Sequence, residues 1–217
     1  MNARTPAVVL GAGFLLFWVG AAFWSLDFQQ ADTGLALHAV AEQSFRWAWI
    51  HVFQAIGTVI TAAGFVLWHQ LRRERGDVLA SGVGATSYLI GAALWVTALV
   101  LRLTVTVAAA AAPTPGYALF DLLGSGLLVG HLLLAHAASV LFGIGLVRSG
   151  DRAVGTVGIV VGGALGIALA FGAGPLGALS APFLAQLLNP VLAGYLLLTS
   201  RTQTRRSPHV APAGHAG

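Results

Sequence analysis

The chain has 217 residues, of which 57% are hydrophobic and only 8% are charged. Soluble domains contain roughly 45–50% apolar and about 25% charged residues, so a chain this apolar could not hide its nonpolar surface from water. The net charge of +4 comes from arginines at the ends of apolar runs, a distribution that argues against a nucleic-acid-binding surface. The absence of cysteine excludes disulfides, iron–sulfur clusters, cysteine-ligated zinc and thiol nucleophiles.

Six apolar runs are long enough to cross a membrane as helices, because a bilayer core of roughly 30 Å requires about 20 residues. In chain order they cover residues 7–26, 47–68, 79–106, 117–147, 153–172 and 181–200. Pro113, Pro115 and Gly116 separate the third run from the fourth, since they stop a helix and favour a tight turn. The sequence therefore predicts an all-α fold, a polytopic transmembrane helical bundle of six spans over residues 1–200, held in a lipid bilayer.

The arginines predict how this bundle is oriented. Nine of them fall on one side of a six-span arrangement, whereas the other side has only Arg46, together with Asp27, Asp32 and Glu42. Arginine and lysine are enriched in the cytoplasmic loops of membrane proteins. Both termini are therefore predicted to be cytoplasmic (N-in/C-in), and the lysine-free, alanine- and glycine-rich composition favours the inner membrane of a bacterium.

The two ends of the chain and the connection after the first span are interpreted separately from the other spans. A cleaved signal peptide over residues 1–25 is the alternative to a first span, but the run exceeds the usual length of about 7–15 apolar residues and five further spans follow. Residues 35–45 have the mixed polarity of a short helix at the membrane surface. Residues 201–217 are polar and are predicted to form a disordered cytoplasmic tail.

Polar side chains fall on a single face in four of the spans, which predicts that these faces point into the bundle. Serine and threonine at such positions usually only join helices, whereas ionisable groups within spans usually pair or mark a pathway. On this basis the candidate ligand-binding residues are His51, Arg102, Asp121, His131, Gln186 and Asn189.

Four of these residues are expected at a similar depth in the outer half of the bundle, at 1.5 Å per helical residue: His51, Arg102, Asp121 and Gln186. An ion pair between Arg102 and Asp121 would remove much of the roughly 2.5–3.5 kcal/mol that an arginine costs within a membrane, and His51 could donate to the same carboxylate. Two alternatives remain open. Arg102 extends to the outer headgroups while Asp121 caps its helix, or the residues bind a ligand or a proton.

His131 and His136 are expected deeper in the fourth span. A haem between helices needs two axial ligands at one depth, and no other span has a histidine at the level of His131. The five-residue separation turns the two imidazoles about 140° apart, so they do not form an i, i+4 pair for zinc. No metal or cofactor is predicted, and haem b would require imperfect ligation.

Rows of glycine predict close helix packing in the fourth and fifth spans. The rows are Gly126 with Gly130, and Gly158 with Gly162 and Gly166. They are interpreted first as contacts within the chain. The alternative is that they join two copies as a homo-oligomer or bind a membrane partner.

Motifs for common enzyme chemistry are absent from the sequence. It has no P-loop, nucleophile elbow or HExxH motif and no pair of carboxylates in the core, so no catalytic residue is predicted and an enzyme is not expected. The first functional hypothesis is a membrane protein that binds or moves a small molecule or ion through its polar interior. The alternative is a structural or accessory subunit that packs through its glycine rows, and a membrane enzyme or haem-binding protein ranks third. A cavity that reaches Arg102 and His131 would favour binding, and a packed interior would favour the accessory role.

Overall fold

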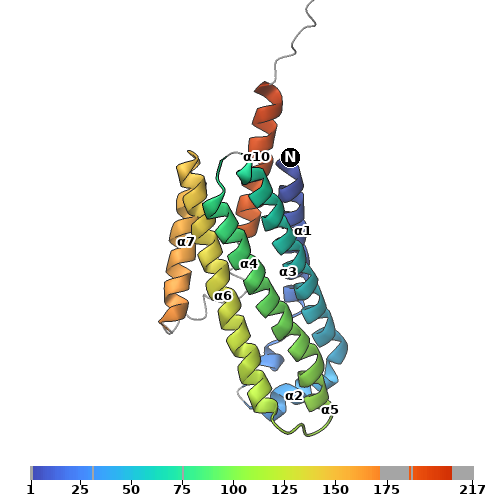
Figure 1. Cartoon of the computed structure of the whole chain (residues 1–217). Helices are drawn as coiled ribbons and strands as arrows, with labels where there is room; N and C mark the ends of the chain where they lie inside the picture. The colour runs from blue at the N-terminus through green and yellow to red at the C-terminus, as the bar shows by residue number, and fades with distance from the viewer. Residues whose placement is uncertain (1, 31, 75, 172–185, 187, 207–217) are drawn as a thin grey trace, which may run out of the picture.

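The structure, a computed structural model, describes residues 2–30, 32–74, 76–171, 186 and 188–206. Every regular element in these ranges is a helix (Figure 1). In chain order they are α1 (Arg4–Ala22), the 3₁₀-helix η1 (Leu26–Gln29), α2 (Thr33–Glu42), α3 (Ser44–Arg73), α4 (Leu79–Leu101), the π-helical turn η2 (Arg102–Thr106), α5 (Val107–Ala111), α6 (Tyr117–Arg148), α7 (Arg152–Ala170) and α10 (Leu188–Arg206).

Five helices are long and apolar enough to cross a membrane, which supports the predicted membrane bundle. They are α1, α3, the continuous helix Leu79–Ala111, α6 and α7. The sixth predicted run, 181–200, begins outside the described residues, and the apolar part of α10 covers only Asn189–Leu198. Helix α10 continues to Arg206, past the predicted end at Ser200. Residues 201–206 are therefore helical, which corrects the predicted start of a disordered tail; residues 207–217 lie outside the described ranges.

The helices differ in length, and this difference shapes the molecule. Helix α3 has 30 residues, Leu79–Ala111 has 33 and α6 has 32, so each is about 45–50 Å long at 1.5 Å per residue. Helices α1 and α7 have 19 residues each, or about 28 Å. Figure 1 shows that α1 and α7 start at the same end of the bundle and stop before the far ends of the long helices.

The two ends of the bundle differ in the elements and charges that they contain. The arginine-rich end comprises the start of α1, the α3–α4 and α6–α7 connections and the charged end of α10. The distal end comprises η1, α2, α5 and the start of α6 (Figure 1). Helix α2 corresponds to the short helix predicted over residues 35–45, and it begins where Asp32 Oδ1 accepts a hydrogen bond from the Leu35 amide at 3.0 Å.

Tight turns connect the long helices. Gly116, with φ of 77°, comes directly before α6, and Gly150, with φ of 97°, lies between α6 and α7. Both residues adopt the left-handed region that glycine tolerates without steric cost. The predicted break at Pro113 and Pro115 coincides with the end of α5 at Ala111.

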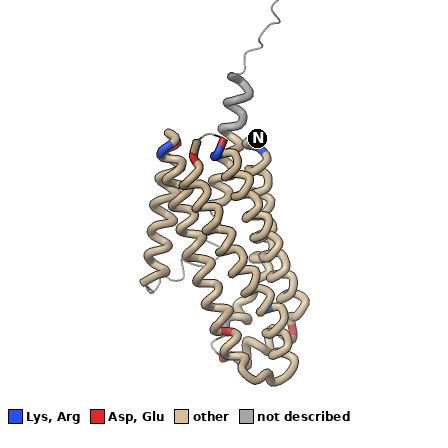
Figure 2. Tube along the Cα trace, viewed as in Figure 1, with Lys and Arg blue, Asp and Glu red and all other residues tan. Residues whose placement is uncertain are grey.

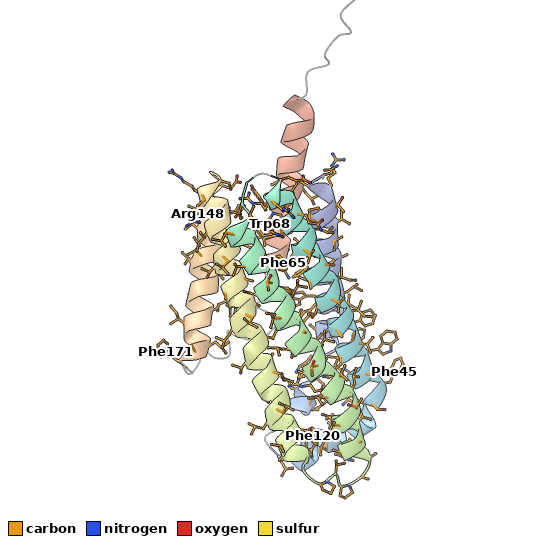
Figure 3. All side chains as sticks on the ribbon, in the orientation of Figure 1. Phe45, Phe65, Trp68, Phe120, Arg148 and Phe171 are labelled. Atoms are coloured by element: carbon orange, nitrogen blue, oxygen red, sulfur yellow. The ribbon has the colours of Figure 1, made fainter. Side chains whose placement is uncertain are left out.

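Charged residues gather at the two ends and leave the middle of the bundle bare (Figure 2). The described residues include large apolar side chains exposed at the surface. Phe45, Phe120 and Phe171 are 75%, 41% and 82% exposed, and Figure 3 shows Phe45 and Phe171 at the outer edge of the bundle. A helical bundle with this exterior is suited to lipid rather than water as its surroundings.

An aromatic cluster closes the interior towards the arginine-rich end. Phe65 and Phe142 stack with ring centroids 4.7 Å apart, and Trp68 lies 4.5 Å from Phe142. All three side chains are at most 3% exposed, and Figure 3 places Phe65 and Trp68 inside the bundle. These three buried rings pack against one another between α3 and α6.

Glycines bring two pairs of helices into backbone contact. A Cβ atom on Gly162 of α7 would lie 2.9 Å from the carbonyl oxygen of His136 in α6 and 2.9 Å from Ser139 Cβ. Its neighbours in the row, Gly158 and Gly166, also face α6. The second predicted row is different, because Gly126 faces open space and Gly130 approaches only the Leu94 side chain.

Close contacts that the sequence analysis missed join α1 to α3. A Cβ atom on Gly13 would lie 2.8 Å from the carbonyl oxygen of Gly57, and one on Gly64 would lie 2.8 Å from the Leu10 side chain. The signal was present in the spacing, because Gly13 and Gly20 on α1, and Gly57 and Gly64 on α3, are each seven residues apart. Two glycines seven residues apart lie on nearly the same face of a helix.

Candidate functional site

A cavity of about 340 Å³ lies at the distal end, lined by residues of η1, α2, α3, α4, η2 and α6 and of the segments that flank η1. We call it the distal chamber. Its polar lining comes from Gln30, Thr33, Gln54, Arg102, Thr106, Tyr117 and Asp121. Its aromatic and aliphatic lining comes from Trp24, Phe28, Ala36, Leu37, Val40, Trp47, Trp95 and Leu128. Small-molecule sites typically have volumes of about 300–1,000 Å³ and this mixture of apolar walls with a few polar groups.

The chamber exists because the chain folds back over the end of the long helices. The segment after α1 forms η1 and α2, and both contribute lining residues opposite α4 and α6. Phe28 of η1 packs edge-on against Trp47 of α3 with ring centroids 5.0 Å apart, and Trp24 lies 5.9 Å from Phe28. Arg46 holds the end of α1 to α3, since its guanidinium donates to the carbonyl oxygens of Phe23 and Trp24.

Arg102 reaches the chamber from a π-helical turn. The turn η2 (Arg102–Thr106) interrupts the helix that continues as α5. A π turn inserts an extra residue and leaves backbone groups without their usual partners, and such turns are frequent at functional sites. Here Trp47 Nε1 donates to the Arg102 carbonyl oxygen at 3.0 Å. This bond fixes the wide turn and therefore the position from which the Arg102 side chain extends.

Arg102 and Asp121 line the same chamber and a smaller neighbouring pocket, and their charges interact. No ion pair with a nitrogen–oxygen distance within 4.0 Å joins them, and neither side chain makes a hydrogen bond to another described residue. The direct ion pair expected from the sequence is therefore not formed in this structure. The two opposite charges face the chamber without neutralising each other by contact.

His51 lies behind the chamber wall rather than in it. Its Nδ1 is 2.7 Å from the Trp47 carbonyl oxygen, so Nδ1 carries the proton and donates. The imidazole also contacts the Trp47 ring at a centroid distance of 4.2 Å. The expected hydrogen bond from His51 to Asp121 is not formed, and His51 instead supports the tryptophan that fixes the Arg102 turn.

Trp95 forms the floor of the chamber and separates it from His131. The two rings stack with centroids 5.7 Å apart and planes inclined by 15°. His131 is fully buried against Gly91, and within the described part of the chain neither of its ring nitrogens has a hydrogen-bond partner. The chamber thus reaches Arg102 but stops one aromatic ring short of His131.

Gln186 and Asn189 belong to a deeper polar group, not to the chamber. Gln186 Nε2 donates to the Tyr88 hydroxyl at 3.1 Å, and Asn189 Nδ2 donates to Gln186 Oε1. Tyr88 in turn lies edge-on to His131 at a centroid distance of 6.3 Å. The predicted layer of four residues is therefore corrected: Arg102 and Asp121 share the chamber, whereas Gln186 lies beyond its floor.

A polar network at the arginine-rich end was missed by the sequence analysis, which used Arg72 only to orient the bundle. Arg72 is 3% exposed. Its Nη2 donates to Ser149 Oγ at 2.7 Å, to the Gly145 carbonyl oxygen at 2.9 Å and to Asp77 Oδ2 at 3.3 Å. The sequence did contain an indication of this network. Asp77 follows Arg72 by five residues in a short connection, a spacing that lets the two side chains pair.

The described residues contain no group of three or more His, Asp or Glu side chains placed to hold a metal ion. His136 is 1% exposed and lies where α6 meets α7, away from the distal chamber. Comparisons of this chain with protein-family models, with curated proteins and with solved structures gave no match. The distal chamber is therefore the main basis for a functional hypothesis.

Proposed function

We propose that this chain is a six-span membrane protein whose distal chamber binds a small organic molecule at the outer face of the membrane. The arginine-rich end lies in the cytoplasm, so both termini are cytoplasmic and the chamber faces outward. One observation carries the proposal: a 340 Å³ cavity holds an arginine and an aspartate that do not touch. Arg102 and Asp121 line one cavity without direct contact, so their hydrogen-bonding groups remain available, and such a cavity is suited to a polar guest.

The depth of the chamber supports an extracellular ligand. Arg102 is 23 residues beyond Leu79 at the start of α4, so it lies about 35 Å from the arginine-rich end at 1.5 Å per residue. A bilayer core of roughly 30 Å measured from that end stops short of it. This position favours the alternative in which Arg102 extends to the outer headgroups, where a direct ion pair with Asp121 is not needed.

The glycine contacts within the chain favour binding over the accessory role. The α7 glycine row is occupied by contacts with α6, and the glycines of α1 and α3 contact each other. A docking role for these glycines would require the contacts within the chain to break. Passage across the membrane would likewise require the Phe65–Phe142–Trp68 cluster to open.

The proposed orientation can be measured by cysteine labelling, because the native chain contains no cysteine. Leu35 on α2 is 59% exposed, and Val78 at the start of α4 is 55% exposed. A membrane-impermeant maleimide added to intact cells should label Leu35→Cys and spare Val78→Cys. Both should react after the cells are opened. Labelling of Val78→Cys in intact cells would reverse the orientation and place the chamber in the cytoplasm.

The binding proposal predicts that filling the chamber abolishes ligand-induced stabilisation. Ala36 lines the chamber from α2, whereas Ala41 on the same helix is exposed and lies outside it. The purified protein is screened by thermal unfolding against organic acids, amines and amino acids at millimolar concentration. A ligand at ten times its Kd stabilises by about 1.4 kcal/mol, which corresponds to a shift of a few degrees.

We expect Ala36→Trp to lose the shift that the native chain shows and Ala41→Trp to retain it. The two variants carry the same substitution on one helix, so a general effect of a bulky side chain on α2 would appear in both. Absence of a shift with every compound, or an equal shift in Ala36→Trp, would contradict a binding role for the chamber.

A further inference from the structure

The charges of the chamber lining are balanced. Among the described residues that line it, Arg102 is the basic one and Asp121 the acidic one, and all others are neutral. The other charged groups at the distal end are engaged elsewhere: Arg46 donates to backbone carbonyls, Asp32 caps α2, and Asp27 bonds with Ser25. A guest that brings one net charge would therefore leave one lining charge without compensation.

The chemistry of the two charged groups indicates what each could bind in a guest. A guanidinium presents a rigid fork of donors that matches a carboxylate through two parallel hydrogen bonds. A carboxylate accepts from the three donors of an ammonium group. Arg102 is held from its backbone by the Trp47 bond to its carbonyl oxygen, and Asp121 extends from the first turns of α6. The two helices thus keep the charges apart in the absence of a guest.

The walls of the chamber suit an apolar body between or beside these charges. Trp24, Phe28 and Trp47 form one aromatic wall, and Trp95 forms the floor. Aromatic faces bind flat or aliphatic groups by dispersion and also attract cations through their quadrupole. Gln54, Thr106 and Tyr117 add neutral hydrogen-bonding groups.

We propose that the ligand of the distal chamber is a small zwitterion, whose anionic group binds Arg102 and whose cationic group binds Asp121. This inference rests on the proposed function, because it names the class of molecule that the chamber holds. A compound of amino-acid type, with a carboxylate and an ammonium on an apolar body, has the required charge pattern and size.

The test compares ligands that differ only in charge. Phenylalanine is matched with 3-phenylpropanoate, which lacks the amine, and with 2-phenylethylamine, which lacks the carboxylate. Alanine, propanoate and ethylamine form a second series with a smaller body. Binding to the purified full-length protein in detergent is measured by isothermal titration calorimetry. In at least one series we expect the zwitterion to bind about tenfold or more tightly than either singly charged analogue, since each charge-assisted hydrogen bond adds to affinity.

Two variants test which lining residue binds which charged group of the zwitterion. In Arg102→Gln the zwitterion should bind no better than the amine, because the carboxylate has lost its partner. In Asp121→Asn it should bind no better than the carboxylate. If Arg102→Gln still binds the amine analogue and Asp121→Asn still binds the carboxylate analogue, each variant is folded. Glu42→Gln, the same acid-to-amide change on the exposed end of α2, should leave every affinity unchanged.

The outcomes separate the two proposals. If a singly charged analogue binds as tightly as the zwitterion in both series, or if the two variants lose all ligands equally, the zwitterion assignment is wrong. The binding function then stands wherever Ala36→Trp abolishes the stabilisation. If neither series binds and no compound stabilises the native chain, the proposed function fails with it.

Discussion

Replacing Arg72 with glutamine should destabilise the folded protein by about 3–5 kcal/mol, the usual cost of removing one partner from a buried ion pair. The Arg72 guanidinium joins the end of α3 to Asp77 and to Gly145 and Ser149 at the end of α6. Without it, the Asp77 carboxylate loses its cationic partner, and the Gly145 carbonyl oxygen and the Ser149 hydroxyl each lose one hydrogen bond, in a site that excludes most water. The free energy of unfolding is measured by titrating the protein in mixed micelles with a denaturing detergent.

Arg73 provides the matched control for this experiment. It is the next residue of α3, it is exposed, and no hydrogen bond or ion pair joins its side chain to another described residue. Arg73→Gln removes the same charge from the same last turn of α3, so an effect on membrane orientation would be shared by both variants. Equal losses of stability would show that charge at this helix end matters and that the buried contacts of Arg72 do not. A double change with Asp77→Asn should be less than additive, because the two residues interact directly.

Five of the six predicted spans have matching long apolar helices in the described residues, because hydropathy and bilayer thickness are local constraints on a helix. Pro113 and Gly116 marked a break, and α5 ends at Ala111 before it. The predicted first and last residues of these spans were less accurate, since apolarity does not show where a helix ends. The long helices extend past the predicted ends, and Leu79–Ala111 passes Thr106 without stopping.

The candidate site was predictable only in part. Arg102 and Asp121 were selected because ionisable residues in apolar helices are costly, and both line the chamber. The π turn at Arg102 and the aromatic wall from Trp24 and Phe28 depend on contacts between segments far apart in the chain, which helical periodicity does not encode. Gln186 was expected at the level of Arg102, but it contacts Tyr88, which precedes Arg102 by 14 residues in the chain and so lies deeper in the bundle.

The second large effect concerns Gly162, where leucine should destabilise the fold by about 1–3 kcal/mol or more, as expected for overpacking. Even a Cβ atom there would meet the His136 carbonyl oxygen at 2.9 Å, and a backbone group cannot turn aside as a flexible side chain can. The adjacent Gly163 has nothing within 4 Å of the same Cβ position. Gly163→Leu should therefore be tolerated, and because leucine favours a helix more than glycine does, it should stabilise α7 slightly.

Measuring unfolding and oligomeric state on the same samples decides what the α7 glycine row does. If the row packs α7 against α6 within one chain, Gly162→Leu lowers the unfolding midpoint at every protein concentration, and Gly163→Leu does not. If the row joined two copies, the folded monomer would survive in Gly162→Leu and only a dimer would disappear. The second result would support an accessory role. It would show that the α7 glycine row binds a second chain, so the α6–α7 contacts would no longer argue against that role.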